Sequence, residues 1–140
     1  MERVLRGGCH CGKVRVELTT AMRTEEFRPR ACDCSFCTKH GAAYVSDPAG
    51  RLRITGSQDV ADYRQGSGTA RMLLCRSCGV LVAAVLEENG RRFGTVNAKC
   101  LEDIAFGEPQ TVSPRTLGVD DKKARWTRLW TPDVEIVAAE

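Results

Sequence analysis

Apolar and polar side chains alternate along several short segments of this chain. In residues 12–19, Val14, Val16 and Leu18 lie on one side and charged residues occupy the positions between them, which is typical of a half-buried β-strand. Further strands are predicted over residues 27–31, 42–46, 51–55, 60–64, 69–75, 80–86 and 92–98. Many short strands separated by glycine-containing turns predict a mainly β domain with antiparallel pairing and little helix.

Helix is predicted at two places. Residues 35–40 can form one helical turn, with Ser35 as its N-cap and Gly41 as its stop. Beyond residue 101 the periodic pattern weakens and prolines interrupt it, so we expect mostly loop there, with one short helix around 121–128.

The chain has 140 residues, which suits one domain with a core of its own. We expect a single zinc-binding domain over residues 1–140 whose tail, residues 104–140, is the least defined part. This tail carries both tryptophans, Trp126 and Trp130. Their spacing of four places them on one helix face, where they are expected to anchor the tail to the core.

The composition argues against a membrane-spanning protein and against a nucleic-acid-binding protein. Hydrophobic residues make up 42% and charged residues 28% of the chain, as in ordinary globular proteins. No apolar run approaches the roughly 20 residues of a membrane span. The net charge is only +3 and the basic residues are mixed with acidic ones, which disfavours nucleic acid as a partner. No secretory signal is recognisable, so we expect a reducing compartment, the cytoplasm.

Cysteine is the residue type that points to chemistry. Seven of the eight cysteines fall into three short motifs: C-x-C at 9–11, C-x-C-x2-C at 32–37 and C-x2-C at 75–78. Such spacings are typical of metal sites, above all of zinc, which prefers four ligands in a tetrahedron. A disulfide is disfavoured within a C-x-C pair, because side chains two apart in an extended segment diverge.

Seven thiols do not divide into two sites of four, so the sequence predicts one closed and one open zinc site. The two outer pairs, far apart in the chain, would cross-link it as a structural site: Cys9, Cys11, Cys75 and Cys78. The central triplet would provide three ligands and one free position, as reactive zinc sites do: Cys32, Cys34 and Cys37. Cys100 stands alone and is expected to be a small buried side chain.

The three motifs, GCHCGKV at 8–14, CDCSFC at 32–37 and CRSCG at 75–79, together resemble the glutathione-dependent formaldehyde-activating enzyme family, which includes the centromere protein V type. The resemblance covers about the first 100 residues. It implies antiparallel sheets folded over each other, often called a β-tent. It also implies a structural zinc on the outer four cysteines, a catalytic zinc on the triplet, and carbon–sulfur lyase activity that joins glutathione to formaldehyde.

In the mechanism that this resemblance implies, the triplet holds zinc and the free position holds the thiol substrate as a thiolate beside the aldehyde carbon. The three cysteines would then be ligands and not nucleophiles. Glutathione carries carboxylates, so a cationic pocket is expected. The basic residues nearest to the cysteine motifs in sequence are Lys39, His40, Arg71 and Arg76.

Two alternatives to this mechanism stay open at this point. His40 follows Cys37 at a spacing that could close a Cys3His structural site. The protein would then be a non-catalytic binding module stabilised by two structural zinc ions. A lyase or transferase acting on another small thiol or aldehyde is the second alternative.

Overall fold

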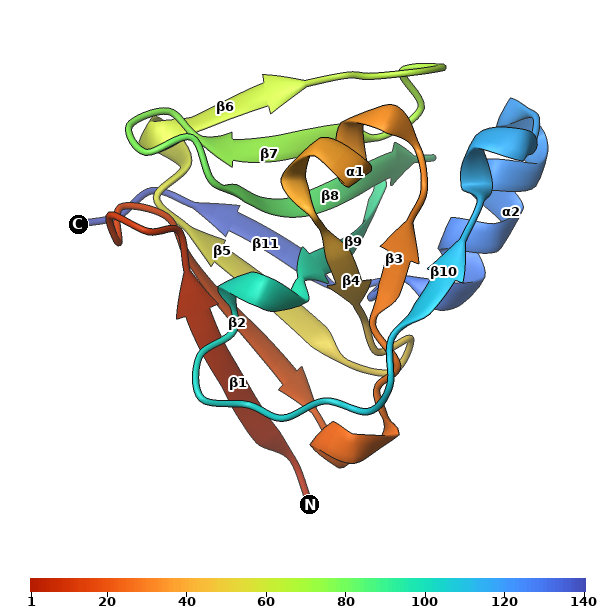
Figure 1. Ribbon diagram of the computed structural model, residues 1–140. Helices are drawn as coiled ribbons and strands as arrows, with labels where there is room; N and C mark the ends of the chain where they lie inside the picture. Colours follow the sequence, from red (N-terminus) through yellow and green to blue (C-terminus); the bar gives the residue numbers. More distant parts are fainter.

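The computed structural model describes residues 1–140 and is dominated by strands (Figure 1). The strands are β1 (Arg3–Gly8), β2 (Arg15–Thr20), β3 (Arg30–Cys32), β4 (Ala43–Val45), β5 (Arg51–Thr55), β6 (Val60–Tyr63), β7 (Arg71–Cys75), β8 (Leu81–Glu88), β9 (Arg91–Asn97), β10 (Gln110–Val112) and β11 (Val134–Val137). The α-helices are α1 (Ser35–His40) and α2 (Val119–Leu129), and the short 3-10 turns are η1 (Thr24–Glu26), η2 (Ser57–Asp59), η3 (Ala98–Cys100) and η4 (Pro114–Thr116).

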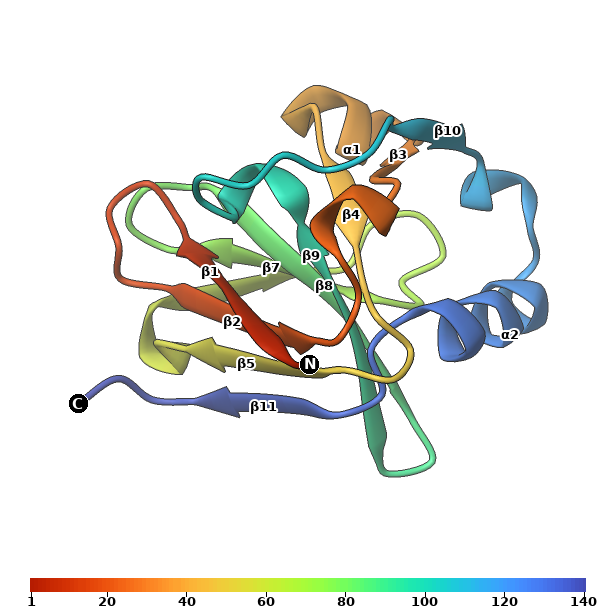
Figure 2. The same ribbon diagram turned by 90° about the horizontal axis from the view of Figure 1, so that it is seen from below.

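Two sheets make up the fold (Figures 1 and 2). The smaller has four strands in the order β1-β2-β5-β11, and the larger has seven in the order β10-β3-β4-β9-β8-β7-β6. Gly94 in β9 is one point of close approach between the sheets, because a Cβ there would lie 2.9 Å from Leu52 Cδ2 of β5 and 3.1 Å from Val134 Cγ2 of β11. A side chain at this position would force the side chains of Leu52 and Val134 to shift.

The core explains the apolar run in β8. Residues 81–86 are all buried, as expected for a strand that is covered on both faces. Val82 and Val85 belong to the cluster shared with the smaller sheet, whereas Leu81 and Leu86 belong to the cluster on the opposite face, with α1 and α2. β8 is therefore the centre of the fold. No helix in the structure is both long and apolar enough to span a bilayer.

The prediction of a mainly β domain with few helices is confirmed, but purely antiparallel pairing is wrong. β10 runs parallel to β3, and β11 runs parallel to β5. Both strands belong to the tail that the sequence predicted as mostly loop. They are short and only partly buried, so the alternation of side chains is too brief to identify a strand from the sequence. The sheets are mixed because this tail returns to both of them.

The predicted helices are present, with two adjustments. α1 ends at Gly41, which adopts the left-handed conformation with φ 60°, as predicted, but its N-cap is Cys34 rather than Ser35. A sulfur takes the place of the usual oxygen and accepts the N–H of Cys37 at 3.4 Å. α2 covers the predicted residues 121–128 and extends beyond them at both ends.

Candidate metal centres and the adjoining pocket

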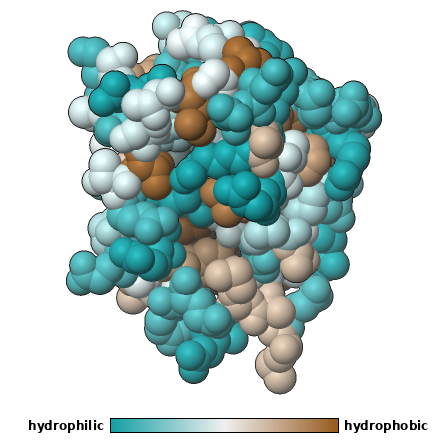
Figure 3. All heavy atoms as spheres, turned by 90° about the vertical axis from the view of Figure 1, so that its right-hand side faces the viewer, coloured by the Kyte–Doolittle hydropathy of each residue, from teal (hydrophilic) through white to brown (hydrophobic).

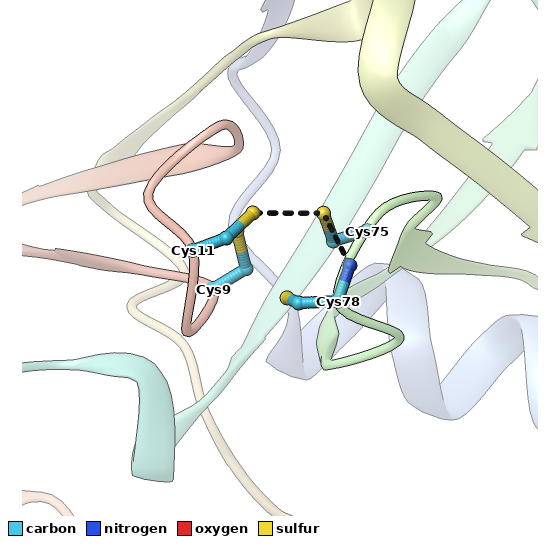
Figure 4. Close-up of side chains that lie close together, drawn as sticks. All are labelled: Cys9, Cys11, Cys75 and Cys78. Atoms are coloured by element: carbon cyan, nitrogen blue, oxygen red, sulfur yellow. Dashed lines mark hydrogen bonds between the residues drawn. The ribbon is translucent and has the colours of Figure 1, made fainter.

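Four thiols lie close together at one end of the sheets, and they come from two loops that are far apart in the sequence (Figure 4). Cys9 and Cys11 lie in the loop between β1 and β2, whereas Cys75 ends β7 and Cys78 follows in the turn before β8. Their sulfurs all lie within 4.8 Å of one another. We call these residues the four-thiol cluster; the structure brings together the four cysteines that the sequence assigned to the closed site.

Backbone N–H groups donate hydrogen bonds to two sulfurs of this cluster. Cys75 Sγ accepts the N–H groups of Ser77 and Cys78, each at 3.4 Å, and Cys9 Sγ accepts the N–H of Val14 at 3.3 Å. Burial acts to raise the pKa of Cys75, but the N–H groups of Cys78 and Ser77 act against it and the pKa is lowered, which favours the thiolate form that binds metal.

The dimensions of the four-thiol cluster fit a tetrahedral zinc site. The distance between Cys9 Sγ and Cys11 Sγ is 3.7 Å, and that between Cys11 Sγ and Cys75 Sγ is 3.6 Å. A tetrahedron of sulfurs around zinc, with bonds of about 2.3 Å, has edges of about 3.8 Å. These two edges therefore have the length that a tetrahedral zinc site requires. A metal there would link the smaller sheet to the larger one.

The central triplet forms a second group, which we call the three-thiol cluster. Cys32 ends β3, Cys34 caps α1, and Cys37 lies in the first turn of that helix. Their sulfurs also lie within 4.8 Å of one another. The hydroxyl of Tyr44, from the neighbouring strand β4, lies 3.2 Å from Cys37 Sγ. The sequence-based prediction did not identify this tyrosine, because only the pairing of β3 with β4 brings it to the cluster.

Electrostatics favour one thiolate in the metal-free three-thiol cluster. A hydrogen bond from the Cys37 thiol lowers the pKa of Cys32 to about 6, although burial acts in the opposite direction. The same contact, together with burial, raises the pKa of Cys37 well above its ordinary value. Burial and the neighbouring Cys37 raise the pKa of Tyr44. Tyr44 therefore keeps its proton at neutral pH and can donate a hydrogen bond to sulfur.

His40 does not belong to the three-thiol cluster. Its side chain is exposed at the end of α1, where its ring packs against Phe36 with 4.7 Å between centroids. Asp33 also faces elsewhere, since its carboxylate accepts hydrogen bonds from Ser113 Oγ and Arg115 Nε. The cluster therefore offers three protein ligands, and the structure gives no support to closure of the site by His40.

A pocket adjoins the three-thiol cluster, between the larger sheet and the tail. Its volume is about 70 Å³, and its wall includes Cys32, Cys37, Tyr44, Trp126 and Trp130. The rings of the two tryptophans stack with centroids 4.7 Å apart and an angle of 14° between their planes. Trp130 is buried, as the predicted anchoring role requires. Both tryptophans also line the pocket, which the spacing argument did not predict.

The pocket is cationic, but not through the residues that sequence proximity suggested. Its lining contains none of Lys39, His40, Arg71 and Arg76. The basic residues that line it are instead Arg30, Lys122 and Arg125. Two of these belong to α2, far from the cysteines in sequence, so no sequence spacing could identify them. Burial, and secondly the charge of Arg125, lower the pKa of Arg30 to about 10.

Cys100 lies outside both clusters and is buried, as predicted. Its thiol donates a hydrogen bond to the carbonyl oxygen of Leu81 at 3.4 Å. Burial, followed by the neighbouring sulfurs of Cys9 and Cys78, raises its pKa to about 12. It is therefore a protonated packing residue at neutral pH.

Together, the two mixed sheets and the two cysteine clusters define a class of protein: a small β domain with thiol-rich sites suited to metal. The profile of the glutathione-dependent formaldehyde-activating enzyme family matches residues 4–118. This match spans most of the chain, and the protein belongs to that family. The matched region contains both clusters but ends immediately before α2.

A crystal structure of a Rhodobacter sphaeroides protein has a similar fold. The two chains are 28% identical, the alignment covers 96% of this chain and 100% of the other, and the TM-score is 0.55. The likeness therefore extends over nearly the whole length of this chain.

Proposed function

We propose that this protein is a zinc-dependent enzyme of the carbon–sulfur lyase type. It adds glutathione, or a related thiol, to formaldehyde or another small aldehyde. The observation that carries the proposal is the three-thiol cluster at the wall of a pocket. Three ligands leave a fourth position for a reactant. A reducing compartment such as the cytoplasm suits a protein whose thiols stay unpaired.

We assign different roles to the two clusters. The four-thiol cluster holds a structural zinc that links the sheets, and the three-thiol cluster holds a catalytic one. Tail strands β10 and β11 pair with both sheets, so we treat residues 1–140 as one zinc-binding domain and the folded-over sheets as the family's β-tent. Zinc bound by the triplet would lower the pKa of an incoming thiol and keep it deprotonated.

The protein's own residues position the reactants. Cys32 and Cys37, which line the pocket, would hold the metal at its wall, and the Tyr44 hydroxyl holds the sulfur of Cys37 by a hydrogen bond. In the reaction, the substrate sulfur forms a bond to the aldehyde carbon and the carbonyl π bond breaks. The proton lost by the thiol is returned, through solvent, to the resulting alkoxide. No oxidant or reductant is required.

The direct test is the rate of S-hydroxymethylglutathione formation from glutathione and ¹³C-formaldehyde, followed by NMR exchange spectroscopy. The zinc-loaded protein should accelerate the exchange above the uncatalysed rate, and Cys32→Ser should abolish the acceleration. Cys100→Ser, which alters a buried thiol outside both clusters, serves as the control and should retain activity. Equal rates with and without wild-type protein, for glutathione and for smaller thiols, would refute the proposal.

A further inference from the structure

The three cations of the pocket have no acidic partner. Arg30, Lys122 and Arg125 form no salt bridge, although several of their neighbours do. Lys123, adjacent on α2, pairs with Glu88 at 3.1 Å, and Arg71 in β7 pairs with Asp62 and Glu87. The lining of the pocket contains no aspartate or glutamate. The pocket therefore concentrates positive charge that the protein itself leaves uncompensated.

Arg30 is held in place by neutral groups. Its Nη2 donates to Ser46 Oγ at 2.6 Å and to Thr95 Oγ1 at 3.3 Å. Each hydroxyl in turn donates to a backbone carbonyl, Ser46 to Leu129 and Thr95 to Val45. The guanidinium is thus oriented without being neutralised. Its remaining N–H groups are available, and a planar guanidinium matches a carboxylate in particular.

Burying part of a cation without an acidic partner costs free energy, and a second cation beside it adds electrostatic repulsion. An anionic ligand removes both costs. The pocket volume of about 70 Å³ is well below the roughly 300–1,000 Å³ of pockets that take up a whole drug-sized ligand. It suits a carboxylate and a short stem. The rest of a larger thiol, such as glutathione, would lie outside.

We propose that Arg30, Lys122 and Arg125 form a carboxylate-binding subsite that selects the thiol substrate of the three-thiol cluster. This inference rests on the proposed function, because it places the reacting sulfur at Cys32 and Cys37 in the same pocket. α2 supplies two of the three cations and lies beyond the residues that match the family profile. Figure 3 shows the face of the molecule that carries α2 and β10, where hydrophobic residues lie among strongly hydrophilic ones.

The protein contains its own probe for this subsite. Trp126 and Trp130 are the only tryptophans and both line the pocket, so intrinsic fluorescence reports its occupancy without any turnover. The matched ligands are 3-mercaptopropanoate and its neutral amide, 3-mercaptopropanamide, which share the same thiol and chain length. The metal-loaded wild type should bind the carboxylate at least about tenfold more tightly, the range of a charge-assisted hydrogen bond. The preference should shrink as salt is raised.

Arg125→Gln is the decisive variant, since this side chain lies on the surface of a helix and its loss should not affect folding. It should reduce the carboxylate preference at least about fivefold and leave the affinity for the amide unchanged. Arg128→Gln removes the same charge from an exposed position on the same helix, outside the lining, and should behave as wild type. Lys122→Gln should give a smaller loss in the same direction.

Equal affinity for the two thiols in the wild type, or a preference that survives in Arg125→Gln and Lys122→Gln, would overturn the subsite. These results are separate from those of the NMR assay. Carboxylate selection without accelerated exchange would retain the subsite and refute the enzyme. Accelerated exchange with equal binding of the carboxylate and the amide would retain the enzyme and refute the subsite.

Discussion

The division of labour between the two cysteine clusters can be tested by the effect of each on stability. Cys75→Ser removes a ligand from the four-thiol cluster, and Cys32→Ser makes the same change in the three-thiol cluster. A metal bound by both Cys11 and Cys75 would close a loop of 64 residues, whereas Cys32 and Cys37 are five positions apart. Loop-closure entropy grows as the logarithm of loop length, so the longer link contributes about 2 kcal/mol more.

This difference is large enough to measure. For a chain of this length, each kcal/mol corresponds to about 3–4 °C in melting temperature. Cys75→Ser should therefore melt at least about 7 °C below Cys32→Ser, and further below wild type, because metal binding and folding are coupled at a site that joins two sheets. Cys32 is preferred to Cys34 for this comparison, since the sulfur of Cys34 also caps α1.

The assay is differential scanning calorimetry of metal-loaded proteins, with metal content measured on the same samples. Each variant should lose about one zinc ion per chain. Cys100→Ser provides the baseline for changing a buried thiol. Equal melting temperatures for Cys75→Ser and Cys32→Ser, with zinc lost from both, would refute the assignment of the structural role to the four-thiol cluster.

Three further predictions concern single features of the structure. His40→Ala should keep the metal content of wild type, because its ring lies away from the three-thiol cluster; loss of one metal ion per chain would contradict this. Arg30→Met should raise the melting temperature by about 3 °C, since an unpaired cation gives way to an apolar side chain while Ser46 and Thr95 keep their carbonyl acceptors. A lower melting temperature would show that Arg30 is compensated. A strong chelator should destabilise wild type at least as much as Cys75→Ser does, as judged by circular dichroism.

The cysteine clusters could be anticipated because local spacing determines them. A C-x2-C turn directs both sulfurs to one side, and the number of thiols leaves few ways to divide them. The structure brings together both predicted groups. The central strands could be anticipated for a similar reason, since burial on one or both faces leaves a pattern in the sequence, as in β2 and β8.

The tail and the pocket could not be anticipated, because their structure depends on contacts between distant segments. β10 and β11 are short, and their pairing with β3 and β5 is determined by where the chain returns. Arg125 is a charged residue on an amphipathic helix, and the sequence alone suggests an ordinary solvated side chain. Only the packing of α2 against the larger sheet brings Arg125 to the lining of the same pocket as Arg30.

α2 contains none of the seven clustered cysteines, so selectivity for the thiol can be changed without changing the proposed metal ligands. Truncation is unsuitable for testing this, since β11 follows α2 and pairs with β5. Reversing two charges, with Lys122→Glu and Arg125→Glu together, leaves that pairing intact. The lining then carries one cation and two anions, so the cationic thiol cysteamine should bind more tightly than 3-mercaptopropanoate in the tryptophan fluorescence assay, at unchanged zinc content. If the double variant still prefers the carboxylate, α2 does not determine which thiol enters.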